Sequence, residues 1–88
     1  MKLNETYMIR EFNGTVYAVA VDSKSEKEKK PILLNKTARI LWEELSEDVS
    51  EEDLIDALLE EYEITRQTAE IDTKEFLSVI RKAGLLTE

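Results

Sequence analysis

The sequence contains neither cysteine nor histidine, and this double absence removes whole classes of chemistry. Without cysteine there is no disulfide, and without either residue there is no zinc site of the Cys/His type. Catalytic triads and dyads that need a histidine base or a cysteine nucleophile are excluded for the same reason. Most hydrolytic and redox mechanisms therefore lack their usual residues in this chain.

Glycine is almost as scarce, with Gly14 and Gly84 alone, so a glycine-rich phosphate loop is excluded. Acidic residues are plentiful, but pairs such as Glu43 and Glu44 or Glu60 and Glu61 are typical of a solvated helix face. They do not suggest an acid/base pair or a carboxylate metal site. We expect no enzyme activity, no cofactor and no bound metal.

Long apolar runs and an excess of basic charge are also missing. No window approaches the ~20 apolar residues that a membrane span requires, and the N-terminal segment has no apolar signal region. A cytoplasmic protein without a membrane partner is the expectation. The net charge of -8 disfavours nucleic acid, because such binding depends on Lys and Arg displacing counterions.

The chain is short, at 88 residues, and predicts a single domain over residues 1–88. A domain of this size buries roughly 60% of its unfolded surface, which is enough for one core but not for a deep catalytic cavity. A binding surface is the better expectation.

Two strands joined by a tight turn are predicted near the N-terminus. Residues 7–12 and 15–21 are rich in aromatic and β-branched residues, and Asn13 with Gly14 between them is the strongest short-range hairpin signal. Both faces of the second segment are apolar, so we expect it to be a central strand.

A charged segment, residues 22–30, follows. Mixed-charge runs usually stay in water, so it is predicted to be a solvated loop, with a steering patch for an acidic peptide as the alternative. Residues 31–34, Pro-Ile-Leu-Leu, then form a third short strand. Pro31 cannot donate a ladder hydrogen bond, which suits an edge position.

The apolar pattern then changes to a helical period, and three helices are predicted. Asn35 caps the first, Ser50 caps the second, and the third spans about residues 68–83 and ends at Gly84. The expected inward face of the first consists of Ala38, Leu41, Trp42 and Leu45. That of the second consists of Leu54, Ile55, Leu58, Leu59 and Tyr62.

The third helix has an apolar face with two different margins. Its predicted centre is formed by Ala69, Thr73, Phe76, Ile80 and Ala83. Leu77 lies at one margin with Lys74 and Arg81, whereas Val79 lies at the other with Asp72, Glu75 and Lys82. The residues leave open which margin faces the edge strand.

This order predicts an α+β domain, a three-stranded antiparallel β-meander followed by three α-helices laid on one face. Edge strands carry unpaired N–H and C=O groups that can pair with another chain, so proteins usually protect them with charge, proline or bulges. Here the apolar edge of residues 32–34 is protected by Pro31 alone.

Residues 33–42 (LLNKTARILW) and 71–86 (IDTKEFLSVIRKAGLL) resemble the PqqD family, named for the pyrroloquinoline quinone biosynthesis protein D. The resemblance covers about residues 7–86. The family's Leu-Asn pair, small residue and tryptophan are matched by Leu34, Asn35, Ala38 and Trp42. Its aspartate, Phe-Leu pair and closing Gly-Leu are matched by Asp72, Phe76, Leu77, Gly84 and Leu85.

The resemblance implies a winged-helix-like recognition element of natural product biosynthesis. Such domains bind the leader segment of a ribosomally made precursor peptide as an extra strand, between the third strand and the third helix. They present it to a separate maturation enzyme, often a radical SAM protein. The exposed edge would then be functional, since main-chain hydrogen bonds give affinity and side-chain pockets give specificity. The implied contact residues are Ile32, Leu33, Leu34, Asp72, Lys74, Phe76, Leu77, Val79 and Arg81.

Two alternatives stay open. A DNA-binding winged helix can be built from the same elements, although the net charge opposes it. The edge strand could also pair with a second copy to give a symmetric dimer. We expect a monomer or a weak homodimer.

Overall fold

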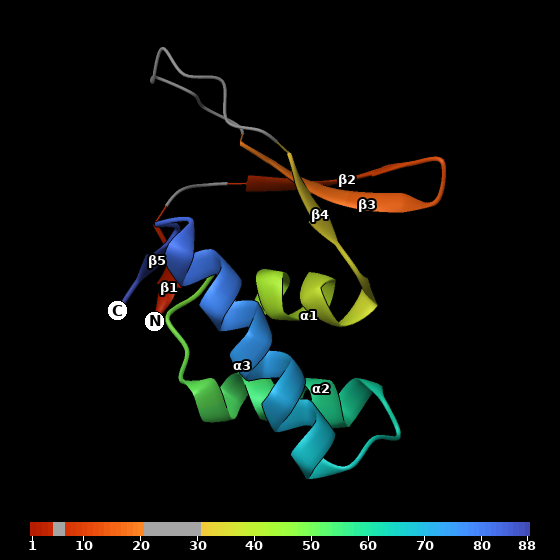
Figure 1. Cartoon of the computed structure of the whole chain (residues 1–88), viewed down its shortest axis with the longest axis vertical. Helices are drawn as coiled ribbons and strands as arrows, with labels where there is room; N and C mark the ends of the chain where they lie inside the picture. The colour runs from red at the N-terminus through yellow and green to blue at the C-terminus, as the bar shows by residue number, and fades with distance from the viewer. Residues whose placement is uncertain (5–6, 21–30) are drawn as a thin grey trace.

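The computed structural model describes residues 1–4, 7–20 and 31–88. A meander of strands is followed by three helices, as the sequence predicts, and a short strand is added at each end of the chain (Figure 1). The elements are β1 (Lys2–Leu3), β2 (Tyr7–Phe12), β3 (Thr15–Ala20), β4 (Ile32–Leu34), α1 (Lys36–Glu44), α2 (Glu51–Glu61), α3 (Arg66–Lys82) and β5 (Leu86–Thr87). The fold class is α+β.

The main sheet has the antiparallel order β2-β3-β4, so the prediction that the second strand is central is confirmed. Asn13 and Gly14 have φ values of 52° and 78°, which are the left-handed values that a two-residue type I′ turn requires. β4 begins at Ile32, one residue later than predicted. Residue 21 and the predicted charged loop of residues 22–30 lie outside the described residues.

Each helix begins at a side-chain cap. Asn35 Oδ1 accepts from the Ala38 N–H, and Ser50 forms a reciprocal capping box with Asp53. α3 begins earlier than predicted because Thr65 is its cap, with a side chain that accepts from the backbone of the third helical residue.

α3 ends in a Schellman motif built on Gly84, which has a φ of 73°. The Gly84 N–H donates to the Arg81 carbonyl, and the Leu85 N–H donates to the Ile80 carbonyl. The chain then turns into β5, which pairs with β1. This two-stranded sheet joins the chain ends and was not expected from the sequence.

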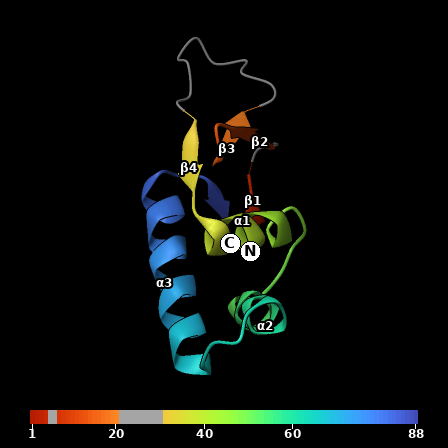
Figure 2. The same ribbon diagram turned by 90° about the vertical axis from the view of Figure 1, so that its right-hand side faces the viewer.

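The core lies between the sheet and the helices. Figures 1 and 2 show β2, β3 and β4 at one end of the molecule, α1 beneath them, and α2 with the start of α3 at the other end. Buried apolar residues come from all the layers: Ala18, Leu34, Leu41, Trp42, Leu45, Leu54, Ile55, Leu58, Ala69, Leu77, Ile80 and Leu85.

The buried face of α3 differs from the prediction by a small rotation. Leu77 is completely buried, whereas Phe76 is half-buried and Ala83, the helix C-cap, is exposed. α3 packs against both α1 and α2, and this places Leu77 in the core. Val79 therefore remains at the open side of the helix, where it is 60% exposed.

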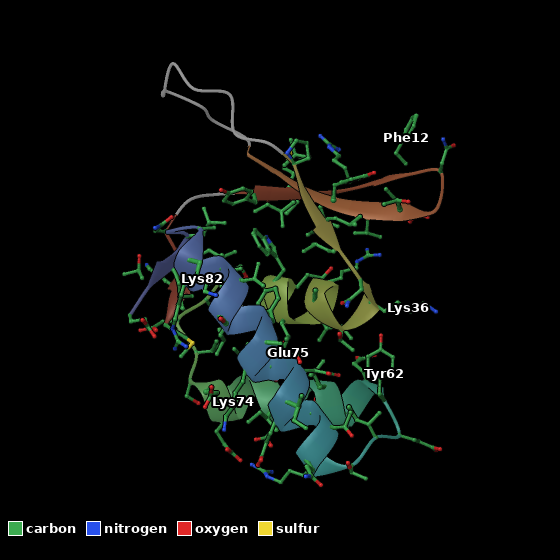
Figure 3. All side chains as sticks on the ribbon, in the orientation of Figure 1. Phe12, Lys36, Tyr62, Lys74, Glu75 and Lys82 are labelled. Atoms are coloured by element: carbon green, nitrogen blue, oxygen red, sulfur yellow. The ribbon has the colours of Figure 1, made fainter. Side chains whose placement is uncertain are left out.

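Among the described residues, no helix lies over the far face of the sheet. Met8, Phe12 and Leu33 are 40%, 70% and 66% exposed. Figure 3 shows Phe12 at the tip of the hairpin, away from the helices. The helices therefore cover one face of the sheet and leave the other open, and β4 is an edge strand of this sheet.

Candidate functional site

β4 is an open edge of the three-stranded sheet, and the register shows which of its backbone groups face outward. A type I′ turn is closed by a hydrogen bond between its flanking residues, so Phe12 and Thr15 form a bonded pair. Bonded and non-bonded pairs alternate along an antiparallel ladder. With the register of β3 and β4, this alternation makes Ile32 and Leu34 bond inward to β3. Leu33 therefore directs its N–H and C=O outward.

A groove of about 240 Å³ lies beside this edge. Its walls come from β4, the start of α1 and one face of α3. The lining residues are Ile32, Leu33, Leu34, Asn35, Thr37, Ala38, Asp72, Glu75, Phe76, Val79 and Ile80. In Figures 1 and 2, β4 lies at the C-terminal end of α3, so the groove continues along α3 beyond the end of the strand.

The apolar floor of the groove, which includes Phe76, packs against core residues. The Phe76 ring meets Trp42 edge-on, with 6.2 Å between ring centroids, and Trp42 in turn meets Tyr7 at 5.1 Å. Edge-to-face contacts of this kind prefer one geometry, so the position of Phe76 is fixed from below. Ile80, which also lines the groove, is buried.

The polar end of the groove is formed by the first turn of α1. Asn35 Oδ1 accepts from the Ala38 N–H at 2.8 Å and from Thr37 Oγ1 at 3.1 Å. The cap thereby fixes the position where the strand becomes a helix. Asp72 and Glu75 of α3 line the groove as well.

Two larger hollows occur elsewhere. One, of about 670 Å³, lies beside β1 and α1 and adjoins residues 5–6, which are outside the described residues. The other, of about 770 Å³, lies between the hairpin, Leu33 and Leu34 of β4, the start of α1 and Tyr62. Neither hollow is lined by residues of α3, so neither lies between the edge strand and that helix as the groove of β4 and α3 does.

Carboxylates do not cluster into a metal site in the part of the chain that the structure describes. Among the same residues, no helix combines the length and the apolar character needed to cross a bilayer.

A comparison of the sequence with models of known protein families finds a match. The model of Coenzyme PQQ synthesis protein D (PqqD) matches residues 18–86, which include β4, all three helices and the whole groove. This chain belongs to the PqqD family. The resemblance noted in residues 33–42 and 71–86 is thereby confirmed.

A solved structure gives the same PqqD-family fold. The structure described as "TbiB1 in Complex with the TbiA(beta) Leader Peptide" superposes with a TM-score of 0.69 at 23% sequence identity. The match covers 98% of this chain and 94% of TbiB1. No curated protein matches the sequence.

The structure gathers most of the predicted contact residues of this PqqD-family chain in one place. The groove is lined by the predicted residues Ile32, Leu33, Leu34, Asp72, Phe76 and Val79. The Val79 margin of α3, not the Leu77 margin, thus faces β4. Lys74, Leu77 and Arg81 do not line this groove, because Leu77 is in the core and the other two project elsewhere.

Arg81 has a different partner. Its Nη2 lies 2.6 Å and its Nε 3.0 Å from Glu88 Oε1. Through these bonds the guanidinium lowers the pKa of Glu88 below its usual value. Arg81 therefore links α3 to the end of the chain after β5.

The groove also contains residues that the sequence prediction of contacts did not include: Asn35, Thr37, Ala38, Glu75 and Ile80. Glu75 could have been found, because it lies three residues after Asp72 and four before Val79, on the same side of α3. The sequence predicts a cap role for Asn35 and a core role for Ala38, and both residues reach the groove because α1 starts directly after β4 ends.

Proposed function

We propose that this PqqD-family chain is a non-catalytic module that binds the leader segment of a ribosomally synthesised precursor peptide. The observation that carries the proposal is the groove itself, an apolar trough beside an edge strand whose middle residue directs its backbone groups outward. Family membership supports it. The similar fold of TbiB1, a protein described with a bound leader peptide, supports it further.

The proposed binding mode is strand addition at β4. The outward N–H and C=O of Leu33 pair with the backbone of the leader, which becomes the fourth strand of the sheet. Pro31, two residues earlier, has no N–H to offer, so Leu33 is the main donor along this edge. Main-chain bonds of this kind tolerate many sequences, so affinity does not require one particular leader.

Side chains of the added strand would supply the selectivity. Alternate residues of a strand point to opposite faces, so every second leader residue faces α3. These residues enter the trough over Phe76, Val79 and Ile80. At about 240 Å³ the trough lies below the ~300–1,000 Å³ typical of drug-sized ligand pockets, and it suits one or two side chains.

The bound leader is then presented to a maturation enzyme, for which a radical SAM protein is our proposal. The remaining leader side chains lie on the open face of the sheet, next to the exposed Leu33. The partner enzyme could reach them there without displacing the leader from the groove.

The test is an NMR titration of the isotope-labelled chain with a synthetic peptide that covers the leader of the precursor encoded beside its gene. We expect saturable amide shifts at residues 32–34 and along residues 72–82. Absence of shifts with the leader, combined with shifts on addition of duplex DNA at low salt, would reject the proposal in favour of a winged-helix DNA-binding protein. Sedimentation at several concentrations would detect self-pairing through β4 as a competing use of the same edge.

A further inference from the structure

The walls of the groove carry charge of one sign. Of the residues that line it, Asp72 and Glu75 are the ionisable ones, and no lysine or arginine is among them. The rest are apolar residues and the polar, uncharged Asn35 and Thr37. The groove therefore has an apolar part and an acidic part.

These two carboxylates are free to meet a ligand. Three arginines of the described residues form ion pairs away from the groove: Arg66 pairs with Glu52, Asp56 and Glu70, Arg39 pairs with Glu43, and Arg81 pairs with Glu88. Within the described part of the chain, neither Asp72 nor Glu75 has an ion-pair partner.

The lysines of α3 do not neutralise this part of the groove. Lys74 is next to Glu75 in sequence, but successive helical residues project about 100° apart, and Figure 3 shows the two side chains on different sides of α3. Lys82 lies seven residues beyond Glu75, about 10 Å along the helix axis, near the C-terminal end in Figure 3. The negative charge at the groove is thus uncompensated by its own helix.

We infer that the leader that binds this groove carries a lysine or arginine which contacts Asp72 and Glu75. The inference rests on the proposed function and specifies its ligand. The two carboxylates are three residues apart on one helix face, where Cβ atoms are about 5–6 Å apart, so one cationic group can contact both. An acidic leader would instead place like charges together at this point.

The geometry also gives the position of the basic residue relative to the apolar one. Val79 lies four residues beyond Glu75, a rise of about 6 Å along α3. Two residues of a strand span about 6.6 Å, which is nearly the same distance. A leader residue seated on Val79 and Ile80 therefore has, two positions away on the side nearer Asn35, a residue that faces Asp72 and Glu75. That residue is the basic one.

A general attraction could imitate this effect, because the whole chain carries a net charge of -8 and draws cationic peptides from a distance. The test must separate local pairing from this long-range term. Glu60 and Glu61 serve as the control, since both are exposed on α2, outside the groove. Their double neutralisation changes the net charge by the same amount as neutralising Asp72 and Glu75.

The experiment compares leader affinity by calorimetry for the wild type, Asp72→Asn/Glu75→Gln and Glu60→Gln/Glu61→Gln, using the neighbouring gene's leader peptide. We expect about two- to fivefold weaker binding per lost contact, as for one exposed ion pair. Binding by the groove variant should also depend less on salt between about 0.01 M and 1 M than binding by the α2 control, because both variants keep the same long-range attraction and only the groove variant lacks the local pairs. The α2 control should bind the leader more tightly than the groove variant does. A second peptide with the basic residue replaced by methionine should bind the wild type and the groove variant equally.

The outcomes are distinct. If the leader binds, with NMR shifts at Leu33 and Val79, but the groove variant binds as well as the control, the basic-leader inference is wrong and the proposed function stands. The same conclusion follows if the bound segment contains no lysine or arginine. If no leader binds to the groove at all, the proposed function fails as well. Circular dichroism of each variant tests whether these nearly isosteric substitutions leave the fold intact.

Discussion

Replacement of Leu33 by proline is the sharpest test of strand addition, because it removes one hydrogen-bond donor at the position where a leader would pair. The alternation along the ladder directs this N–H away from β3, so its loss breaks no bond within the sheet. Prolines are tolerated on edge strands for the same reason. The leader carbonyl that would accept from Leu33 is left without a donor.

The expected loss follows from the cost of an unsatisfied acceptor. At a partly buried interface this cost is about 1 to 2 kcal/mol, which corresponds to roughly five- to thirtyfold weaker binding. Since the Leu33 side chain is 66% exposed, little core packing is lost. We expect the Tm to fall by less than about 8 °C, the shift produced by 1 kcal/mol in a domain of this size.

The assay measures Kd by calorimetry and Tm by circular dichroism for three variants. Leu33→Ala keeps the N–H and separates the side-chain contribution. Ile32→Pro removes an N–H that bonds inward to β3, and it should lower the Tm much more than Leu33→Pro does. If Leu33→Pro is folded and binds the leader within twofold of the wild type, the leader does not pair with this edge and the reasoning fails.

Three further predictions concern the leader affinity or the Tm of single variants. Val79→Ser should weaken leader binding about fivefold through lost apolar contact, whereas Ile71→Ser, at a similarly exposed apolar position of α3 outside the groove, should leave leader binding unchanged. Gly84→Ala should lower the Tm by about 4–8 °C, because a left-handed φ costs an alanine about 1 kcal/mol even though its Cβ meets no atom within 4 Å. The hydrogen bond from the Ser50 backbone N–H lowers the pKa of Asp53 below its ordinary value of 3.8. This contact therefore makes its full contribution to the stability of the fold above pH 3.8, and the contribution is lost as the pH falls through the lowered pKa. The Tm difference between wild type and Asp53→Asn should therefore shrink below about pH 4, and a constant difference would contradict this assignment.

The local signals in the sequence were sufficient for most elements. Asn13 and Gly14 specify the hairpin because their positive φ values select one turn, and the caps at Asn35 and Ser50 specify where two helices begin. The edge position of β4 followed from Pro31 and from the order of strands. Each of these depends on residues that are close in sequence.

The margin of α3 that lines the groove was not predictable in this way. Leu77 and Val79 are both apolar and differ by two positions, so periodicity alone allows either one to point into the core. Packing of α3 against both α1 and α2 decides for Leu77, and such long-range contacts leave no local pattern. The pairing of β1 with β5 was missed for a related reason, since each strand has two residues and its partner is at the other end of the chain.

Trp42 gives the groove an optical reporter of its own. It is the one tryptophan of the chain, it is 3% exposed, and its ring touches the Phe76 ring that forms the groove floor. A peptide side chain that binds in the groove would contact Phe76, and a shift of that ring would change the environment of the Trp42 indole. We expect the intrinsic emission to shift in a saturable way during titration without the large red shift that accompanies unfolding. Occupancy of the groove could then be followed in the unmodified protein, with no dye attached to either partner.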